Sequence, residues 1–250
     1  MATPSYPVSH EKFQQFIVQF ACRTPIRKDF SSAERKALEN VLKEVDPELF
    51  QLFSDDTQPN SPHFFQAARQ HIVGGAVTIT VPSLILTNDS VTLLFPVKIG
   101  GRFLSERGNA LDTTDMNKKM SDVLFQIQNT VRGLRYHRAG KIFEMLVGPF
   151  GQEDKDKLLR KLISSDFSLG DVGELDLKFA RYVDLEGEPH NIQTVIKYQQ
   201  LNLGDRFQLG VRVDINNRKL KERLDPADIE KVWGRADSLI FQHLDTILIE

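Results

Sequence analysis

The stretch FFQAARQHIVGGAVTITVPSLILTNDSVTLLFPVKI, residues 64–99, decides the fold class. It is rich in β-branched and other apolar residues, and turn-forming residues interrupt it at Gly74-Gly75 and again at Asn88-Asp89-Ser90. Strands joined by such short turns run antiparallel, because parallel strands need a longer crossover connection. This stretch therefore predicts a meander of antiparallel strands.

The second half of the chain repeats this texture. A strand is expected over Leu134–Val147 and a short charged helix over Glu153–Ile163. Three alternating runs then follow, with turns at Gly187 and Gly204-Asp205; the runs are Leu175–Tyr182, Ile192–Leu203 and Phe207–Ile215. These runs predict a second meander.

Long amphipathic helices are predicted before, between and after the two runs of strands. Ser31 and Glu34 have the spacing of a capping box, in which each residue satisfies a backbone donor of the other. Asp112–Thr114 can cap a second helix, which Gly133 would end. Asp225 followed by Pro226 predicts the start of a C-terminal helix. The segment His10–Arg23 fits a helix or an extended strand equally well.

Two parts of the chain resemble each other. Residues 97–99 and 111–118 parallel residues 211–213 and 224–231: a strand, a polar connection and a helix that opens L-D-x-x-D-Φ-x-K, where Φ is apolar. An internal duplication explains this likeness, but so does the ordinary preference for acidic residues at helix starts. We expect an α+β fold, mainly antiparallel β-meanders each followed by a long amphipathic helix, and the likeness allows two pseudo-repeated halves. The expected parts of one compact unit are an N-terminal segment (1–62) and two meander-plus-helix halves (63–163 and 164–250).

Composition restricts the function. The chain has 250 residues, 40% of them hydrophobic, and its net charge is −2, which argues against wholesale electrostatic coating of nucleic acid. The single cysteine, Cys22, excludes an internal disulfide framework and a thiolate-rich zinc site. Residues 1–9 do not resemble a secretory signal, and the apolar runs at 76–86 and 91–99 are too short for a membrane helix. We therefore expect a cytoplasmic protein with no membrane partner.

Motifs for catalysis or cofactor binding are missing. No phosphate-binding loop and no G-x-S-x-G nucleophile elbow occurs, and the six histidines lack the spacing of a helical metal site. Cys22 could act as a nucleophile with His137 or His190 as its base, but a small buried apolar residue is the better interpretation. We expect no catalytic residue, no metal and no cofactor.

One basic cluster is a candidate nucleic-acid or nucleotide site. Its members are Arg132, Arg135, Tyr136, His137, Arg138 and Lys141. On a strand, these side chains could hold a phosphate and stack a base. The alternative is a solvated strand face whose arginines pair with carboxylates of neighbouring strands, and we favour it because the net charge is close to zero.

The sequence Gly133-Leu134-Arg135-Tyr136 after a helix resembles a strand motif of a sporadically distributed bacterial family of uncharacterised proteins. The run Phe207–Ile215, with Asp214, and the helix that carries Ala236, Ile240 and Phe241 before a final Leu-Ile pair are similar to the ending of that family. His137-Arg138 stand where the family more often has an apolar residue and Asn. The family has no assigned activity, so the resemblance bears on the fold.

Three functions remain. The one we favour is a non-enzymatic interaction protein, a subunit or regulator within a bacterial protein assembly, whose strand edges accept a partner's strand. A homodimer would fit this function, but the partner is not identified by the sequence. The alternatives are a nucleic-acid or nucleotide binder that uses residues 132–141, and an enzyme whose site is assembled from residues far apart in the chain.

Overall fold

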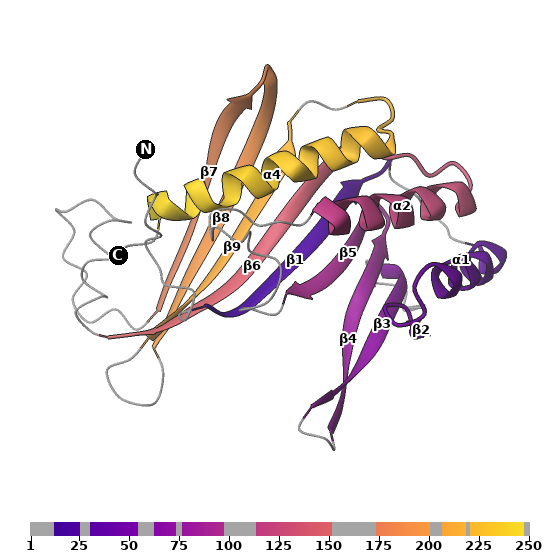
Figure 1. The fold of residues 1–250 in the computed structure, drawn as a ribbon, viewed down its shortest axis with the longest axis horizontal. Helices are drawn as coiled ribbons and strands as arrows, with labels where there is room; N and C mark the ends of the chain where they lie inside the picture. The colour runs from indigo at the N-terminus through magenta and orange to yellow at the C-terminus, as the bar shows by residue number, and fades with distance from the viewer. Residues whose placement is uncertain are drawn as a thin grey trace.

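A computed structural model describes residues 13–25, 31–54, 63–73, 77–97, 114–151, 174–200, 207–218 and 221–247. Its strands form one antiparallel sheet of nine, in the order β2-β3-β4-β5-β1-β6-β9-β8-β7 (Figure 1). The strands are β1 (Phe13–Arg23), β2 (Leu52–Ser54), β3 (His63–Val73), β4 (Val77–Thr87), β5 (Ser90–Val97), β6 (Arg138–Phe150), β7 (Glu174–Leu185), β8 (Glu188–Gln200) and β9 (Phe207–Asn217).

The expected fold class is wrong. The described strands belong to a single large sheet, and the described ranges contain three helices. The described part of the molecule is therefore mainly sheet and not a helix-rich α+β arrangement of meanders that are each followed by a long helix. The two runs of strands are joined within this sheet, because β1 and β6 pair with each other at its centre. Local patterning could not reveal this pairing, since it joins segments more than a hundred residues apart.

The described part of the segment 10–23, which fitted a helix or a strand, is the extended strand β1 from Phe13. It pairs with β5 on one side and β6 on the other, and both pairings are antiparallel. A strand with two neighbours buries side chains efficiently: Val18, Phe20 and Cys22 are all buried toward the helices. The tertiary environment therefore decided a pattern that was ambiguous by itself.

The described helices are α1 (Ser32–Val45), α2 (Thr114–Thr130) and α4 (Pro226–Ile247). The predicted capping box is confirmed: the Ser31 hydroxyl accepts from the Glu34 N–H at 3.2 Å, and the Glu34 carboxylate accepts from the Ser31 N–H at 3.0 Å. Asp225 caps α4, because its carboxylate accepts from the Asp228 N–H at 2.8 Å. Both helix starts could be predicted from the sequence, because each cap joins residues only three positions apart.

The helices lie on one face of the sheet. α4 packs across β6 and β9, α2 packs beside α4, and α1 packs beside α2 (Figure 1). The largest buried side chain is Trp233 of α4, whose ring meets Phe20 of β1 edge-on at a centroid distance of 4.8 Å. Apolar burial of this kind supplies the main favourable free energy of folding. The other face of the central strands carries no described helix.

The turns of the sheet follow the sequence where they are described. The hairpin at Asn88-Asp89 is confirmed: Leu86 pairs with Val91, and the Thr87 hydroxyl accepts from the Ser90 N–H at 3.0 Å. The turns at Gly74-Gly75 and Gly204-Asp205, the charged helix at 153–163 and the boundary at 163/164 lie outside the described residues. Among the helices of the described ranges, none combines the length and apolar character needed to cross a bilayer.

Candidate functional site

The predicted basic cluster does not form one surface. β6 begins at Arg138, so four of the six residues precede the strand instead of alternating along it. Arg132 and Arg135 are exposed in the connection after α2. Tyr136 is buried, and its hydroxyl donates to the Leu124 carbonyl oxygen at 2.9 Å; burial also raises the pKa of this phenol. It is a core residue that ties this connection to α2.

The backbone explains why this connection leaves the sheet. The His137 N–H donates to the Arg23 carbonyl oxygen at 3.1 Å, which is a backbone hydrogen bond between this connection and the last residue of β1. The carbonyl oxygens of Tyr136 and His137 accept from the N–H groups of Leu224 and Lys221, at 2.7 and 3.1 Å. The residues just before α4 therefore form backbone hydrogen bonds with this connection. This long-range partner was not visible in the sequence.

Lys141 lies on the opposite side of the sheet from Arg138, inside the core. Its ammonium group has no exposed surface and donates to both carboxylate oxygens of Asp237, at 2.6 and 2.8 Å, and to the Asn117 amide oxygen at 2.7 Å. It also lies 4.7 Å from the centre of the Phe20 ring, a cation–π distance. These contacts join β6, α2 and α4.

The charge state of this cluster follows from burial. Desolvation lowers the pKa of Lys141 to about 8, and the Asp237 carboxylate opposes that shift. The Asn117 amide donates to Asp237 at 3.0 Å and so completes the triangle. A cluster whose members satisfy one another in this way positions helices, which is a structural role for Lys141 and Asp237.

Arg138 faces the side of the sheet that carries no described helix, where a polar hollow of about 310 Å³ opens. Small residues form its floor: Ala21 of β1 pairs directly with Gly140 of β6. A side chain at position 140 would clash, because an added Cβ would lie 2.7 Å from the Cβ of Asn216 on β9. The register of three strands therefore makes the hollow.

The walls of the polar hollow carry arginines and amides. Arg23, Arg138 and Arg212 line it together with one carboxylate, that of Asp214. The remaining polar side chains in the lining are Gln19, Ser90, Thr92, Gln193 and Asn216. Arg138 is held by the Asn217 carbonyl oxygen, at 2.9 Å from its Nε, and by the Asn216 amide oxygen.

A second, apolar hollow of about 340 Å³ lies on the same face. Gly210 of β9 pairs with Leu146 of β6 and with Lys197 of β8, so a position without a side chain again stands between larger neighbours. Ile17, Leu146 and Val195 supply the apolar lining. Arg212 lines both hollows, and its guanidinium pairs with Glu144 on the neighbouring strand.

The edge of the sheet at β7 is a separate candidate surface. β7 pairs with β8 over twelve residues, and no described strand lies on its other side. Two large hydrophobic side chains are exposed on it: Phe179 at 37% and Tyr182 at 62%. A long strand edge of this kind presents backbone donors and acceptors that a further strand can use.

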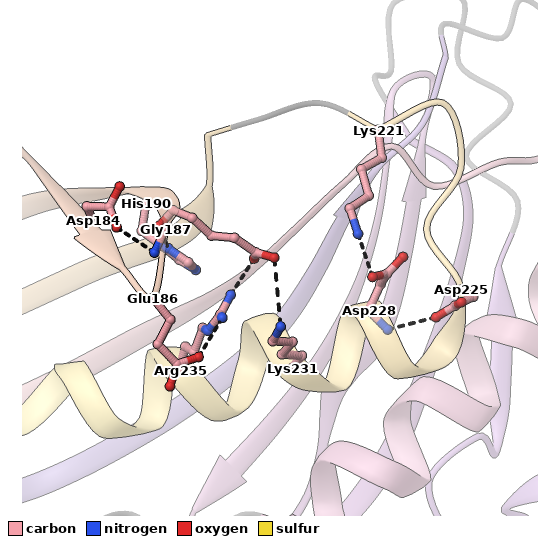
Figure 2. Close-up of polar contacts among 10 residues, drawn as sticks. Asp184, Glu186, Gly187, His190, Lys221, Asp225, Asp228, Lys231 and Arg235 are labelled. Carbon is pink, nitrogen blue, oxygen red and sulfur yellow. Dashed lines mark hydrogen bonds and ion pairs between the residues drawn. The ribbon is translucent and has the colours of Figure 1, made fainter.

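The tip of the β7–β8 hairpin is fixed to α4 (Figure 2). Arg235 of α4 pairs with the carboxylates of Glu186, at 2.8 Å, and Glu188, and Lys231 lies 3.9 Å from Glu188. Glu186 and Gly187 both have positive φ, 53° and 78°, as a two-residue type I′ turn requires, and the Asp184 carboxylate accepts from the Gly187 N–H at 2.8 Å. These ion pairs hold the exposed strand in a fixed position.

Among the described side chains, Cys22, His190 and His243 lie in separate environments. Cys22 is buried, as expected for a small apolar residue, and burial raises the pKa of its thiol. His190 uses its Nδ1 on the Glu188 carbonyl oxygen at 2.9 Å, and His243 contacts the Thr194 hydroxyl at 2.6 Å. Within the described ranges, no group of three or more His, Cys, Asp or Glu side chains could hold a metal ion.

Sequence reasoning missed the polar hollow. Arg138 was in the predicted cluster, but Arg23, Arg212 and Asp214 were not among the candidates. One signal was available: Gly140 lies inside the predicted strand, and a glycine inside a strand often marks a close approach of another group.

Comparisons with known proteins add little. No family model matches the chain, and no curated protein matches it. Among solved structures, the chain is similar to the di-domain ARO/CYC StfQ from the steffimycin biosynthetic pathway, with 10% identity over 92% of this chain and 97% of that one. The TM-score of 0.20 is too low to support an argument about fold or function.

Proposed function

We propose that this is a non-enzymatic interaction protein of the bacterial cytoplasm, a subunit or regulator of a protein assembly, and that β7 accepts a strand from its protein partner. The observation that carries the proposal is the outer edge of β7, which spans Glu174–Leu185 and beside which no other described strand lies. An added strand gains affinity from backbone hydrogen bonds and specificity from side chains on alternate positions.

The side chains of β7 favour a selective partner over indiscriminate pairing. Charged residues of both signs lie along the strand: Lys178 and Arg181 are basic and lie between the acidic Asp176 and Asp184. Such charges discourage pairing with an arbitrary strand, because like charges placed opposite each other are unfavourable. Exposed Phe179 and Tyr182 provide apolar contact area on opposite faces of the strand, and Arg218 covers part of the Tyr182 ring at 4.3 Å.

The anchored hairpin tip supports the same proposal. Because Arg235 holds Glu186 and Glu188 on α4, β7 needs little ordering when a partner strand arrives. Phe179 also packs toward His243 of α4, with ring centres 6.3 Å apart, so the middle of the strand is supported too. A pre-ordered edge loses less conformational entropy on binding.

Proline substitutions test the proposal. Along an edge strand, successive N–H groups point alternately toward the neighbouring strand and away from the sheet. Of the two adjacent substitutions Ala180→Pro and Arg181→Pro, one therefore removes only a donor that points away from the sheet. We expect that variant to keep the thermal stability of the parent and to lose its partner. Light scattering of the purified chain shows whether the partner is a second copy, and cross-linking in cells of the source organism followed by mass spectrometry identifies another protein.

The control is Lys36→Ala on the exposed side of α1, which should keep every complex of the parent chain. If both proline variants fold and keep the complexes of the parent, or if cross-links map away from β7, the proposed use of this edge is wrong.

A further inference from the structure

The face of the sheet that carries no described helix holds a pair of like charges at neighbouring positions. Arg23 of β1 and Arg138 of β6 are direct cross-strand partners, so their side chains leave the same face at neighbouring positions. Like charges placed directly opposite each other destabilise a sheet. Burial and the nearby Arg23 both lower the pKa of Arg138, while Asp214 opposes that shift. This placement is costly unless something negative offsets it.

Carboxylates of the chain itself offset only part of that charge. The Asp89 carboxylate pairs with one amino group of Arg23, and the Glu144 carboxylate pairs with one amino group of Arg212. Neither carboxylate is part of the lining of the polar hollow. Asp214 is in the lining, but it also accepts from the Asn216 amide at 2.8 Å. Each guanidinium has five N–H donors in a planar fork, so donors remain at the rim for an oxyanion.

The neighbouring apolar hollow adds a second requirement for a ligand of this face. Gly140, in the floor of the polar hollow, and Leu146, beside the apolar one, are six residues apart on β6, which is about 20 Å along a strand. Glu144 and the largely buried Ile142 occupy the positions between them on the same face, Glu144 pairs with Arg212, and Arg212 lines both hollows. A ligand that occupies both hollows needs an anionic end and an elongated apolar end.

We propose that this face binds a small amphiphile with an oxyanion head, a carboxylate or a phosphate, near Arg23, Arg138 and Arg212, and lays its apolar tail over Ile142 toward Gly210. The site is on the opposite side of the sheet from the helices and does not involve the edge of β7. The inference is therefore independent of the proposed strand addition.

The test is a calorimetric titration of the full chain with four probes below their micelle concentrations. Dodecanoate and dodecyl phosphate carry the tail and either head, butyrate carries the head alone, and dodecyltrimethylammonium carries the tail with the opposite charge. We expect saturable binding of one or both tailed anions, with the preferred head identifying the source. Butyrate should bind at least about tenfold more weakly, since it cannot fill the apolar hollow.

Two variants test the two ends separately. Arg212→Gln should weaken the tailed anion at least about tenfold, the effect of losing a charge-assisted hydrogen bond. Gly210→Val should also weaken it by filling the apolar hollow; there is room for this side chain, because an added Cβ would lie 3.9 Å from the Lys197 Cβ. Lys36→Gln, which removes one positive charge from α1, should bind like the parent chain. Circular dichroism confirms that each variant is folded.

Several outcomes would overturn the inference. These are equal binding of the tailed cation and the tailed anions, no binding of either anion, or unchanged affinity in folded Arg212→Gln and Gly210→Val. Binding of an acidic peptide to this face in the absence of amphiphile binding would assign the hollow to a protein partner instead.

Discussion

The indole Nε1 of Trp233 donates a hydrogen bond to the carbonyl oxygen of Gly140 at 2.9 Å. Gly140 belongs to the floor of the polar hollow on one face of the sheet. Trp233 is part of α4 and is buried between that helix and the other face. One peptide group therefore joins the helix layer to the candidate ligand site. The missing side chain at position 140 lets Asn216 approach on the next strand, as the 2.7 Å distance from an added Cβ shows.

Trp233→Phe should lower the free energy of unfolding by about 2–3 kcal/mol, because it removes this buried hydrogen bond and part of the packing against Phe20. Urea unfolding followed by circular dichroism measures the change. Phe125→Leu, at an exposed position of α2, is the control and should shift stability by less than about 0.5 kcal/mol. A shift equally small for Trp233→Phe would contradict the role given to this contact.

Lys141→Met should destabilise the protein by about 3–5 kcal/mol, because it leaves the Asp237 carboxylate buried without its cation. Asp237→Leu should cost a similar amount for the converse reason. The double variant should lose much less than the sum of the two, since it removes both charges from the core. A double-mutant cycle from urea unfolding measures the coupling, and strictly additive effects would show that the two groups do not depend on each other.

Acidification should destabilise the fold through His243. Burial and the neighbouring Arg181 lower the pKa of His243 to about 4, from an ordinary value of 6.5. Between these values the unfolded chain binds a proton that the folded chain does not, so stability is complete above about pH 6.5 and falls as the pH drops toward 4. Unfolding free energies at pH 7 and pH 5 should therefore differ more for the parent chain than for His243→Gln.

The control for this experiment is Gln242→Ala, an exposed neighbour on the same helix, which should retain the pH dependence of the parent chain. Carboxylates that titrate in the same range contribute equally to all three proteins, so the comparison isolates His243. An identical drop in the parent chain and in His243→Gln would show that this side chain is protonated as easily in the folded protein as in the unfolded one.

Local signals predicted the parts of the fold that depend on neighbours in the chain. The capping box at Ser31, the cap at Asp225 and the hairpin at Asn88-Asp89 rest on hydrogen bonds between residues at most three positions apart. The turn at Gly187 is of the same kind, because its geometry needs a positive φ that glycine adopts readily. Such contacts form wherever the sequence permits, so the pattern was sufficient.

The candidate sites depended on register between distant strands. Arg23 meets Arg138 only because β1 pairs with β6, and Arg212 approaches Glu144 only because β6 pairs with β9. The sequence placed Arg138 and Lys141 in one basic cluster, yet three positions along a strand put them on opposite faces. A linear pattern contains no information about which strand lies beside which.

By itself, the sequence determined a chain with one buried cysteine, antiparallel strands with short turns and capped amphipathic helices, because composition and local hydrogen bonding specify these features. The tertiary structure alone decided that the described strands form one sheet with β1 and β6 at its centre, that the helices cover one face, and that β7 is left as an edge. The physical reason is that strand order and register minimise the free energy of the whole sheet, in which each side chain packs against residues remote in sequence.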